Sequence, residues 1–257
     1  MRSPIKRKPL RNPGDSLTEY IQDVLFDRVF LYLILALFAV SLAFMEWIRW
    51  YFNSPTSPKL LSVLAVMIVL IATYKIRREL RYVSQLKLGR DGEMAVGQFL
   101  ESLRGRGAQV LHDLPGEGFN VDHVVIHPSG IYAIETKTFS KPDRGEAKIL
   151  FDGESVEILG KRPERNPVVQ ARAIAKWLQG LVRSSTGKNF EVRPVVVFPG
   201  WFIQPTAEAK HSNVWVLNPK ALPSFIENSK PQISESDVHL IKTHLSMYAR
   251  SALATKR

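Results

Sequence analysis

The stretch DHVVIHPSGIYAIETK, from Asp122 to Lys137, decides the fold of this chain. Two short apolar runs, VVI and IYAI, flank the four residues HPSG, and proline with glycine between β-rich runs is typical of a hairpin turn. With the turn centred in the middle of HPSG, paired positions sum to 257. This register predicts that Asp122 lies opposite Glu135 at the open end of the hairpin.

The open end of this hairpin is where chemistry is expected. Lys137 follows Glu135 by two positions, so strand alternation places both side chains on the same face. Two facing carboxylates repel each other and are stable as anions only with a cation between them. Oxygen ligands suit Mg²⁺ or Mn²⁺, and a nearby lysine can stabilise charge on a phosphate. The alternative is an ordinary solvated Glu–Lys pair on a strand.

Residues on both sides of the hairpin predict further helices and strands. Apolar positions at helical spacing precede it, and Asn166-Pro167 is a suitable start for a helix after it. The result is an α/β (α+β) soluble domain. Residues Glu79–Leu103 are expected to be mostly helical, but Gly89, Gly92 and Gly97 interrupt this stretch, so the helix proper is expected to start near Asp91. The other expected elements are strands at 108–114 and within 121–138, a strand pair at 148–158 turning at Asp152-Gly153, a helix from Pro167, strands at 192–198 and 214–217, and helices at 219–227 and from Ser234.

Three segments in this order resemble a known family. They are GRDGEMAVGQFLESL with Glu93, VDHVVIHPSGIYAIETK with Asp122 and the Glu135-x-Lys137 motif, and NPVVQARAIAKWL with Gln170. Together they resemble the nuclease-related (NERD) domain of the PD-(D/E)XK nuclease superfamily over residues 88–200. The resemblance implies a restriction-endonuclease-like α-β-β-β-α-β core, with residues 201–257 completing the soluble domain.

The resemblance also implies roles for the matching residues. Asp122 and Glu135 would be metal ligands, with Glu93 as an additional acid at the metal or its water shell. Lys137 would orient the phosphate or the attacking water, and Gln170 would hydrogen-bond within the site. The implied activity is hydrolysis of DNA phosphodiester bonds with Mg²⁺ or Mn²⁺. Two alternatives stay open: a catalytically silent module that binds nucleic acid or a protein partner at the membrane, and a domain that only mediates assembly.

Two apolar runs precede the soluble domain. Residues 29–45 carry no charge over 17 positions, and residues 60–74 carry none over 15. A bilayer requires about 20 mostly apolar residues, so the sequence predicts a transmembrane helical hairpin at 29–76, with helices at about 29–51 and 60–76. Residues 1–28 are expected to form a basic cytosolic arm in which Ser16 caps a short helix, and residues 77–87 a linker. The alternatives are buried core helices or, for the first run, a cleaved signal peptide.

The formal charge of +11 is concentrated near these apolar runs. Residues 1–89 carry 13 Lys+Arg against 6 Asp+Glu, a net of +7, whereas residues 90–257 carry 22 against 18, a net of +4. The excess therefore suits lipid headgroups as well as DNA. The two flanks of the transmembrane hairpin are basic, whereas its connecting loop offers only Lys59. Because basic flanks stay on the cytoplasmic side, the sequence predicts a multi-pass protein of the cytoplasmic (inner) membrane with both termini and the nuclease-like domain in the cytoplasm.

Other candidate residues have weaker support. The chain has no cysteine, which excludes disulfides and thiolate metal sites. Three histidines near the hairpin lack ligand spacing and are expected to be packed or on the surface: His112, His123 and His127. Three tryptophans could stack on bases but are more often core residues: Trp177, Trp201 and Trp215. A group of basic residues after the hairpin could bind phosphates or be a solvated loop: Lys141, Arg144, Lys148, Lys161, Arg162 and Arg165.

Overall fold

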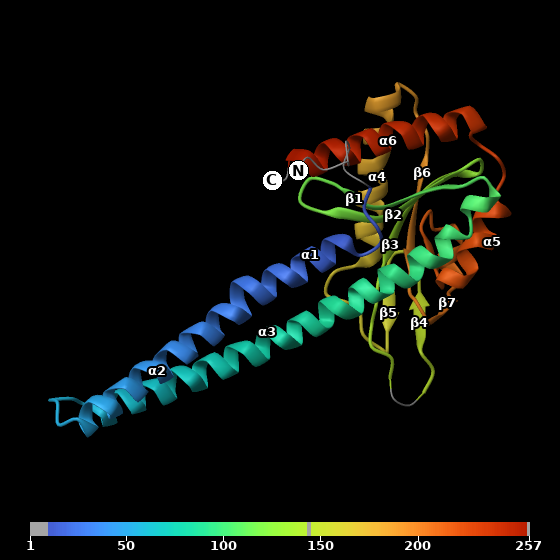
Figure 1. Ribbon diagram of the computed structural model, residues 1–257. Helices are drawn as coiled ribbons and strands as arrows, with labels where there is room; N and C mark the ends of the chain where they lie inside the picture. The colour runs from blue at the N-terminus through green and yellow to red at the C-terminus, as the bar shows by residue number, and fades with distance from the viewer. Residues whose placement is uncertain (1–9, 143–144, 256–257) are drawn as a thin grey trace. The chain divides into compact units, whose positions relative to one another are not determined.

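The computed structural model describes residues 10–142 and 145–255, and the chain divides into two compact units (Figure 1). One unit is Ser16–Leu88. The other combines the residues up to Asp15 with those from Gly89 onward. The first unit is therefore an insertion within the chain of the second. The basic residues of the arm before residue 10 lie outside the described part.

The inserted unit is helical. It contains most of α1 (Asp15–Asp23), a π-helical segment (Val24–Phe30), α2 (Leu31–Tyr51) and the first part of α3 (Pro58–Glu101). Small residues let α2 and α3 approach each other, with Ala39 and Ala43 packed against Ala65. Both helices are long and apolar enough to cross a membrane, and large side chains along them are exposed, among them Leu37, Phe38, Phe44, Leu60, Val66 and Leu70. Such exposure is typical of surfaces that meet lipid or another apolar partner.

Two expectations for this part of the chain are wrong. The short helix expected at the end of the N-terminal arm is present as α1, but this helix begins at Asp15, so Ser16 lies inside it and does not cap it. Residues from Glu79 onward are helical as expected, but residues 77–87 are not a separate linker and the helix does not start near Asp91, because α3 runs without a break from Pro58 to Glu101. Glycines were expected to interrupt this helix, but they permit close packing instead. A Cβ atom on Gly92 would lie 2.0 Å from Thr138 Oγ1.

The other unit is built on a five-stranded sheet with the order β1-β2-β3-β6-β8. Strands β1, β2 and β3 form an antiparallel meander, and β6 and β8 continue the sheet parallel to β3. The bounds are Gln109–Pro115, Asn120–His127, Gly130–Thr136, Val192–Val197 and Trp215–Leu217. Apart from β4 and β5, which belong to a second sheet, the elements follow in the order α3, β1, β2, β3, α4, β6. This order confirms the expected α-β-β-β-α-β core of a mixed α/β fold.

The register of the central hairpin is as predicted. His123 pairs with Ile134 and His127 with Gly130, so paired positions sum to 257. Continued by one position beyond the last pair, this register places Asp122 opposite Glu135 at the open end. Strand β3 is buried along its whole length, because the sheet is covered on both faces.

Helices cover the sheet in an α/β/α arrangement. Helices α4 (Pro167–Thr186) and α6 (Glu235–Thr255) pack on one face, against Val124 and Ala133. The C-terminal part of α3 and α5 (Leu222–Glu227) pack on the other face, against Val125 and Ile134. Three short 3₁₀ helices connect these elements: Arg104–Arg106, Glu208–His211 and Pro219–Ala221. Alternate residues of β2 and β3 thus enter different cores.

A second, three-stranded sheet has the order β5-β4-β7. The predicted strand pair is present as β4 (Lys148–Phe151) and β5 (Val156–Ile158). Strand β7 (Phe202–Pro205) pairs parallel to β4 and was not predicted. Its residues are mostly exposed, so the segment lacks the buried apolar pattern that marks β6. This sheet shares a core with the start of α4 through Phe151 and Val168.

Candidate active site

Asp122 is fixed against the end of strand β3. Its Oδ2 atom accepts a hydrogen bond of 2.7 Å from the backbone N–H of Thr136, the residue after Glu135. The hairpin register and this bond together bring the start of β2 to the end of β3. The backbone N–H of Lys137 then donates to the carbonyl of Val197, which extends the pairing of β3 with β6 by one residue. Both acids therefore sit on backbone that the sheet holds rigidly.

Glu135 is the centre of the side-chain contacts. Its Oε1 atom accepts hydrogen bonds from Lys137 Nζ at 2.7 Å and from Gln170 Nε2 at 2.6 Å. Gln170 lies in the first turns of α4, where the side chain of Asn166 caps the helix by accepting from the N–H of Val168. Glu135 is 4% exposed, and its Oε2 atom is buried without a hydrogen-bond partner among the described residues. An unpartnered carboxylate oxygen in such a position requires a proton or a cation.

Burial raises the pKa of the three acids Glu93, Asp122 and Glu135. Burial raises the pKa of Glu93 to about 8, and the carboxylates of Asp113 and Glu135 add to the rise. Burial, followed by the charges of Glu135 and Glu93, raises the pKa of Asp122 well above its usual range. Burial also raises the pKa of Glu135, against the opposing effects of Lys137 and Gln170. Without a bound cation the group therefore holds protons that isolated carboxylates would release.

Asp113 is a fourth acid of the group, which the sequence analysis missed. In the pairing of β1 with β2, the numbers of two paired residues always add up to 235. The ladder skips one position, and in this register the skipped position is Asp113 opposite Asp122. Asp113 is 2% exposed and has a left-handed φ of 50°, a strained conformation for a residue with a side chain. Arg11 donates to Asp113 Oδ2 at 3.1 Å. The loop PGEGFN is the signal that could have revealed it, because a hairpin closed there aligns Asp113 with Asp122.

These residues suit a hard divalent cation by their chemistry. The acids supply carboxylate oxygens, and one of these, Glu135 Oε2, is buried without a hydrogen-bond partner in the described part of the chain. In residues 10–142 and 145–255, however, no group of three or more His, Asp or Glu side chains is placed to hold a metal ion. Glu93, Asp122 and Glu135 thus do not form a three-carboxylate shell. Mg²⁺ commonly takes one or two carboxylates and completes its shell with water and phosphate, and Asp122 with Glu135 meets that requirement.

The histidines have structural partners. His123 is fully buried, and its Nδ1 atom lies 2.9 Å from Nδ1 of His112, whose other ring nitrogen contacts Glu101 Oε1 at 2.8 Å. Burial lowers the pKa of both rings. His127 Nδ1 lies 2.7 Å from the hydroxyl of Ser129 in the hairpin turn. His123 and His112 are packed, as expected, and the described residues show no metal cluster that contains any of the three.

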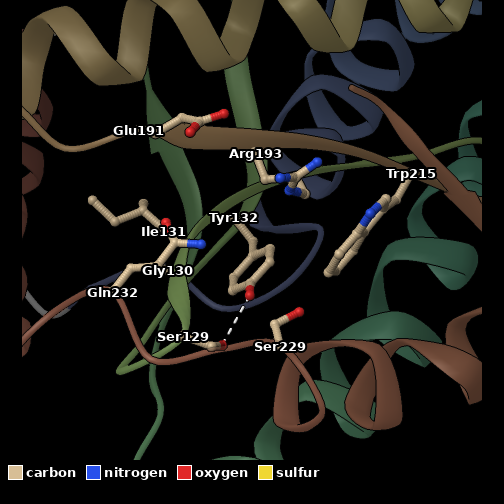
Figure 2. Close-up of a pocket in the computed structure, with 9 residues that line it drawn as sticks. All are labelled: Ser129, Gly130, Ile131, Tyr132, Glu191, Arg193, Trp215, Ser229 and Gln232. Carbon is tan, nitrogen blue, oxygen red and sulfur yellow. Dashed lines mark hydrogen bonds between the residues drawn. The ribbon is translucent and has the colours of Figure 1, made fainter. Parts of the chain in front are cut away.

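The tryptophans are held by other side chains. Trp201 is 1% exposed, and Trp177 packs edge-on against Phe119. Figure 2 shows Trp215 beside Tyr132 and Arg193; the two rings stack at 5.4 Å, and the guanidinium lies 5.2 Å from the indole centroid. Tyr132, Arg193 and Trp215 line a small cavity of about 40 Å³ at the turn of the β-hairpin, which is the end opposite to Asp122 and Glu135. The alternative that these indoles stack on bases is therefore not supported by their positions.

A larger apolar groove is lined by β7 and the segment just before it, by the end of β8, and by the 3₁₀ helix and α5 that come after β8. It has a volume of about 640 Å³ and contains two exposed aromatic rings, Phe202 and Phe225, together with Lys220. Of the basic group after the hairpin, Lys141 lies at this groove, since its Nζ atom is 2.6 Å from where a Cβ on Gly200 would be. Arg162 pairs with Asp152, Lys148 is in β4, Lys161 and Arg165 are exposed, and Arg144 lies outside the described residues. Strands β3, β6 and β8 are parallel, so the groove opens at the same edge of the sheet as Lys137.

Gln170→Leu is expected to lower any metal-dependent activity of this site by about tenfold to a hundredfold, because outer-shell hydrogen bonds orient the groups that bind a metal. The substitution removes the bond from Nε2 to Glu135 Oε1 and leaves the carboxylate held by Lys137 alone. Gln179→Leu on the same helix is the matched control. Equal activity of the two variants, measured at saturating Mn²⁺, would show that Gln170 does not position Glu135.

Comparison with known proteins identifies one family. Residues 88–199 match the family model described as nuclease-related domain (NERD). Among solved structures, the chain is similar to Pyrococcus furiosus SfsA in complex with Ca²⁺, at 17% identity and a TM-score of 0.27. That match covers 49% of this chain and 54% of the SfsA chain, about half of each. Comparison with curated proteins gave no match.

Proposed function

Since residues 88–199 are a nuclease-related domain, we propose that this protein is a membrane-anchored nuclease that hydrolyses DNA phosphodiester bonds with Mg²⁺ or Mn²⁺. One observation carries the proposal. Glu135 is buried, its Oε1 atom is held by Lys137 and Gln170, and its buried Oε2 atom has no hydrogen-bond partner among the described residues. A solvated Glu–Lys pair, the alternative considered from the sequence, would be exposed and would need neither Gln170 nor a second acid.

Each side chain of the site has a definite task in such a reaction. A bound divalent cation supplies a Lewis acid for the phosphoryl oxygen and lowers the pKa of a water ligand. Asp122 and Glu135 would hold it, and the N–H of Thr136 fixes the orientation of Asp122. Lys137 keeps its ammonium group beside Glu135, where it can stabilise the charge that develops on the phosphate. Glu93 holds a proton at neutral pH in the metal-free protein and adds negative potential when it loses that proton.

The test is a cleavage assay on the full chain, purified with its apolar helices. Single-stranded, duplex and branched DNA are incubated with Mg²⁺ or Mn²⁺, beside Asp122→Ala and Lys137→Ala. Metal-dependent cleavage by wild type that both substitutions reduce by about a hundredfold or more supports the proposal. Cleavage of equal rate in all three proteins, or none in any, would instead favour the catalytically silent module that binds nucleic acid or a protein partner.

The apolar groove that contains Phe202 and Phe225 supports the proposal that the partner is a nucleic acid. Exposed aromatic rings beside lysines are typical of surfaces on which unpaired bases stack, at about 1–3 kcal/mol per base. Phe202→Ala combined with Phe225→Ala is therefore expected to weaken binding of a single-stranded oligonucleotide about tenfold, measured by fluorescence anisotropy in EDTA. Met247→Ala is the control, because Met247 on α6 is 62% exposed and Phe202 65%. Equal weakening by both would indicate a non-specific loss of apolar surface.

We further propose that the inserted helical unit anchors the protein in the cytoplasmic membrane. Its two helices satisfy the length and composition of membrane spans. Lysine and arginine are concentrated in the two flanks, before residue 12 and between residues 75 and 87, whereas the connecting loop holds Lys59. By the positive-inside rule, both termini and the nuclease-related domain lie in the cytoplasm, where DNA is accessible.

A further inference from the structure

The apolar groove is joined to the candidate active site along one edge of the five-stranded sheet. At the end of β3, the backbone N–H of Lys137 donates to the carbonyl of Val197 in β6 at 2.9 Å. The N–H of Phe198 then donates to the carbonyl of Leu217 in β8 at 3.0 Å. Since these strands are parallel and neighbouring strands lie about 4.8 Å apart, the end of β8 is about 10 Å from the end of β3, the length of about three stacked nucleotides.

Two aromatic rings of the groove are exposed although their surroundings hold them in place. Phe225 on α5 is 44% exposed, and its ring packs edge-on against Trp215 at 5.4 Å. Phe202 is 65% exposed and begins β7, where its N–H donates to the carbonyl of Ala147 at 2.8 Å. Side chains that are already fixed lose little conformational freedom when a ligand binds them. The groove therefore offers preformed aromatic surface to a flat apolar group.

Two exposed lysines accompany these rings. Lys220 lines the groove, and Lys141 places its Nζ atom 2.6 Å from the position that a Cβ on Gly200 would occupy. Gly200 itself lines the groove, so the Lys141 ammonium lies at its border. Ammonium groups beside aromatic rings match a nucleic acid strand, in which charged phosphates alternate with flat bases.

The groove favours an unpaired strand over a duplex. The bases of a duplex are stacked on one another and offer only their edges, so aromatic rings stack on bases that are unpaired. The outer surface of a duplex is phosphate, which requires cations, whereas the groove is lined mainly by apolar side chains. Its volume of about 640 Å³ is in the range of pockets that hold small organic ligands.

From this arrangement we infer that the groove binds unpaired bases next to the scissile phosphate, and that the substrate is DNA with single-stranded character, such as a free strand, a flap or a frayed end. Phe202 and Phe225 stack on bases about three to five nucleotides from the cleaved bond, and Lys141 and Lys220 contact the phosphates beside them. The inference rests on the proposed function for cleavage, whereas binding depends on the groove alone.

The test measures binding of the full chain to a single-stranded oligonucleotide in EDTA by fluorescence anisotropy, with each base in turn replaced by an abasic site. Wild type is expected to lose about tenfold in affinity where the missing base is one that stacks in the groove. Phe202→Leu combined with Phe225→Leu keeps apolar side chains but removes the rings, so its affinity should be lower and should change less than about twofold at any abasic site. Thermal melting confirms that the variant is folded.

The phosphate contact is tested by salt dependence. Lys141→Ala should reduce the slope of log affinity against log salt by about one, whatever the base sequence. Lys176→Ala is the matched control, because Lys176 is exposed on α4 and does not line the groove. An equal change in both variants would show that only the overall charge matters and would overturn the contact of Lys141.

Cleavage of the same oligonucleotides with Mn²⁺ relates the groove to the active site. The abasic sites that weaken binding should lie about three to five nucleotides from the cut, and a duplex of the same sequence should be cut about tenfold more slowly than the single strand. Equal abasic effects in wild type and the leucine variant would overturn the inference, as would a duplex bound as tightly as the single strand. If no DNA binds in EDTA, the groove belongs to a protein partner and the inference fails. If binding shows the expected dependence on bases but no DNA is cleaved, the proposed nuclease activity fails and the site for unpaired bases stands.

Discussion

Glu135→Gln is expected to leave the protein folded, to abolish measurable affinity for Mn²⁺ and to reduce cleavage of DNA by about a hundredfold or more. The amide oxygen of glutamine can still accept the hydrogen bonds from Lys137 and Gln170, so the local packing is kept. What is lost is the charge on the Oε2 atom, which is buried and has no hydrogen-bond partner within residues 10–142 and 145–255. An amide in its place is a poor ligand for a hard cation, because the anionic oxygen is gone.

The measurement combines titration calorimetry with Mn²⁺ and a cleavage assay, beside a melting curve that confirms folding. Glu191→Gln, at an exposed position just before β6, is the control for a general loss of negative charge. If Glu135→Gln retains Mn²⁺ affinity within a factor of three of wild type, Glu135 is not a metal ligand, and the lysine and glutamine around it have a structural purpose.

The metal-free protein is expected to lose stability as the pH rises from about 5 to about 8. The folded-state pKa of Glu93 is about 8 against an ordinary value of 4.5, and the pKa values of Asp122 and Glu135 are raised as well. Between the unfolded and folded values the native state binds more protons than the unfolded chain, so the free energy of unfolding falls with increasing pH. The loss is on the order of a few kcal/mol, equivalent to a decrease of about 5 °C or more in Tm.

Divalent cations should reverse this trend, because they replace the protons that the carboxylates hold. Thermal unfolding followed by tryptophan fluorescence, in EDTA and in Mn²⁺ at pH 5.5 and pH 8, gives the four values needed. Mn²⁺ should raise Tm more at pH 8 than at pH 5.5, and Asp122→Asn should flatten the pH dependence in EDTA. A Tm in EDTA that increases toward pH 8 would contradict the raised pKa values.

Much of the site could be predicted because it depends on local geometry. The short turn at HPSG fixes the register of β2 and β3, and this register places Asp122 at Glu135. Strand alternation then brings Lys137 to the same carboxylate. These two relations span a turn and a pleat, for which sequence rules are strong. The place of Gln170 in the site was implied by the family resemblance alone, because its bond to Glu135 joins residues 35 positions apart.

The missed features depend on contacts between distant parts of the chain. The partner of Arg11 is 102 residues away, and a left-handed φ at an aspartate has no marker comparable to glycine. Gly92 and Gly97 were interpreted as helix breaks, although each makes room for a neighbour, Thr138 or Pro13. A glycine that ends a helix and a glycine that makes room for a neighbouring side chain look the same in a single sequence.

The division of the chain has a consequence for how the protein is made. Residues 10–15 are synthesised first, the inserted helices next and strand β1 after them, so the Arg11–Asp113 pair closes a loop of about a hundred residues. Contacts of such high sequence separation form slowly. The unit that carries the nuclease-related domain therefore cannot be completed on the ribosome before strand β1 has been synthesised, which is after both inserted helices.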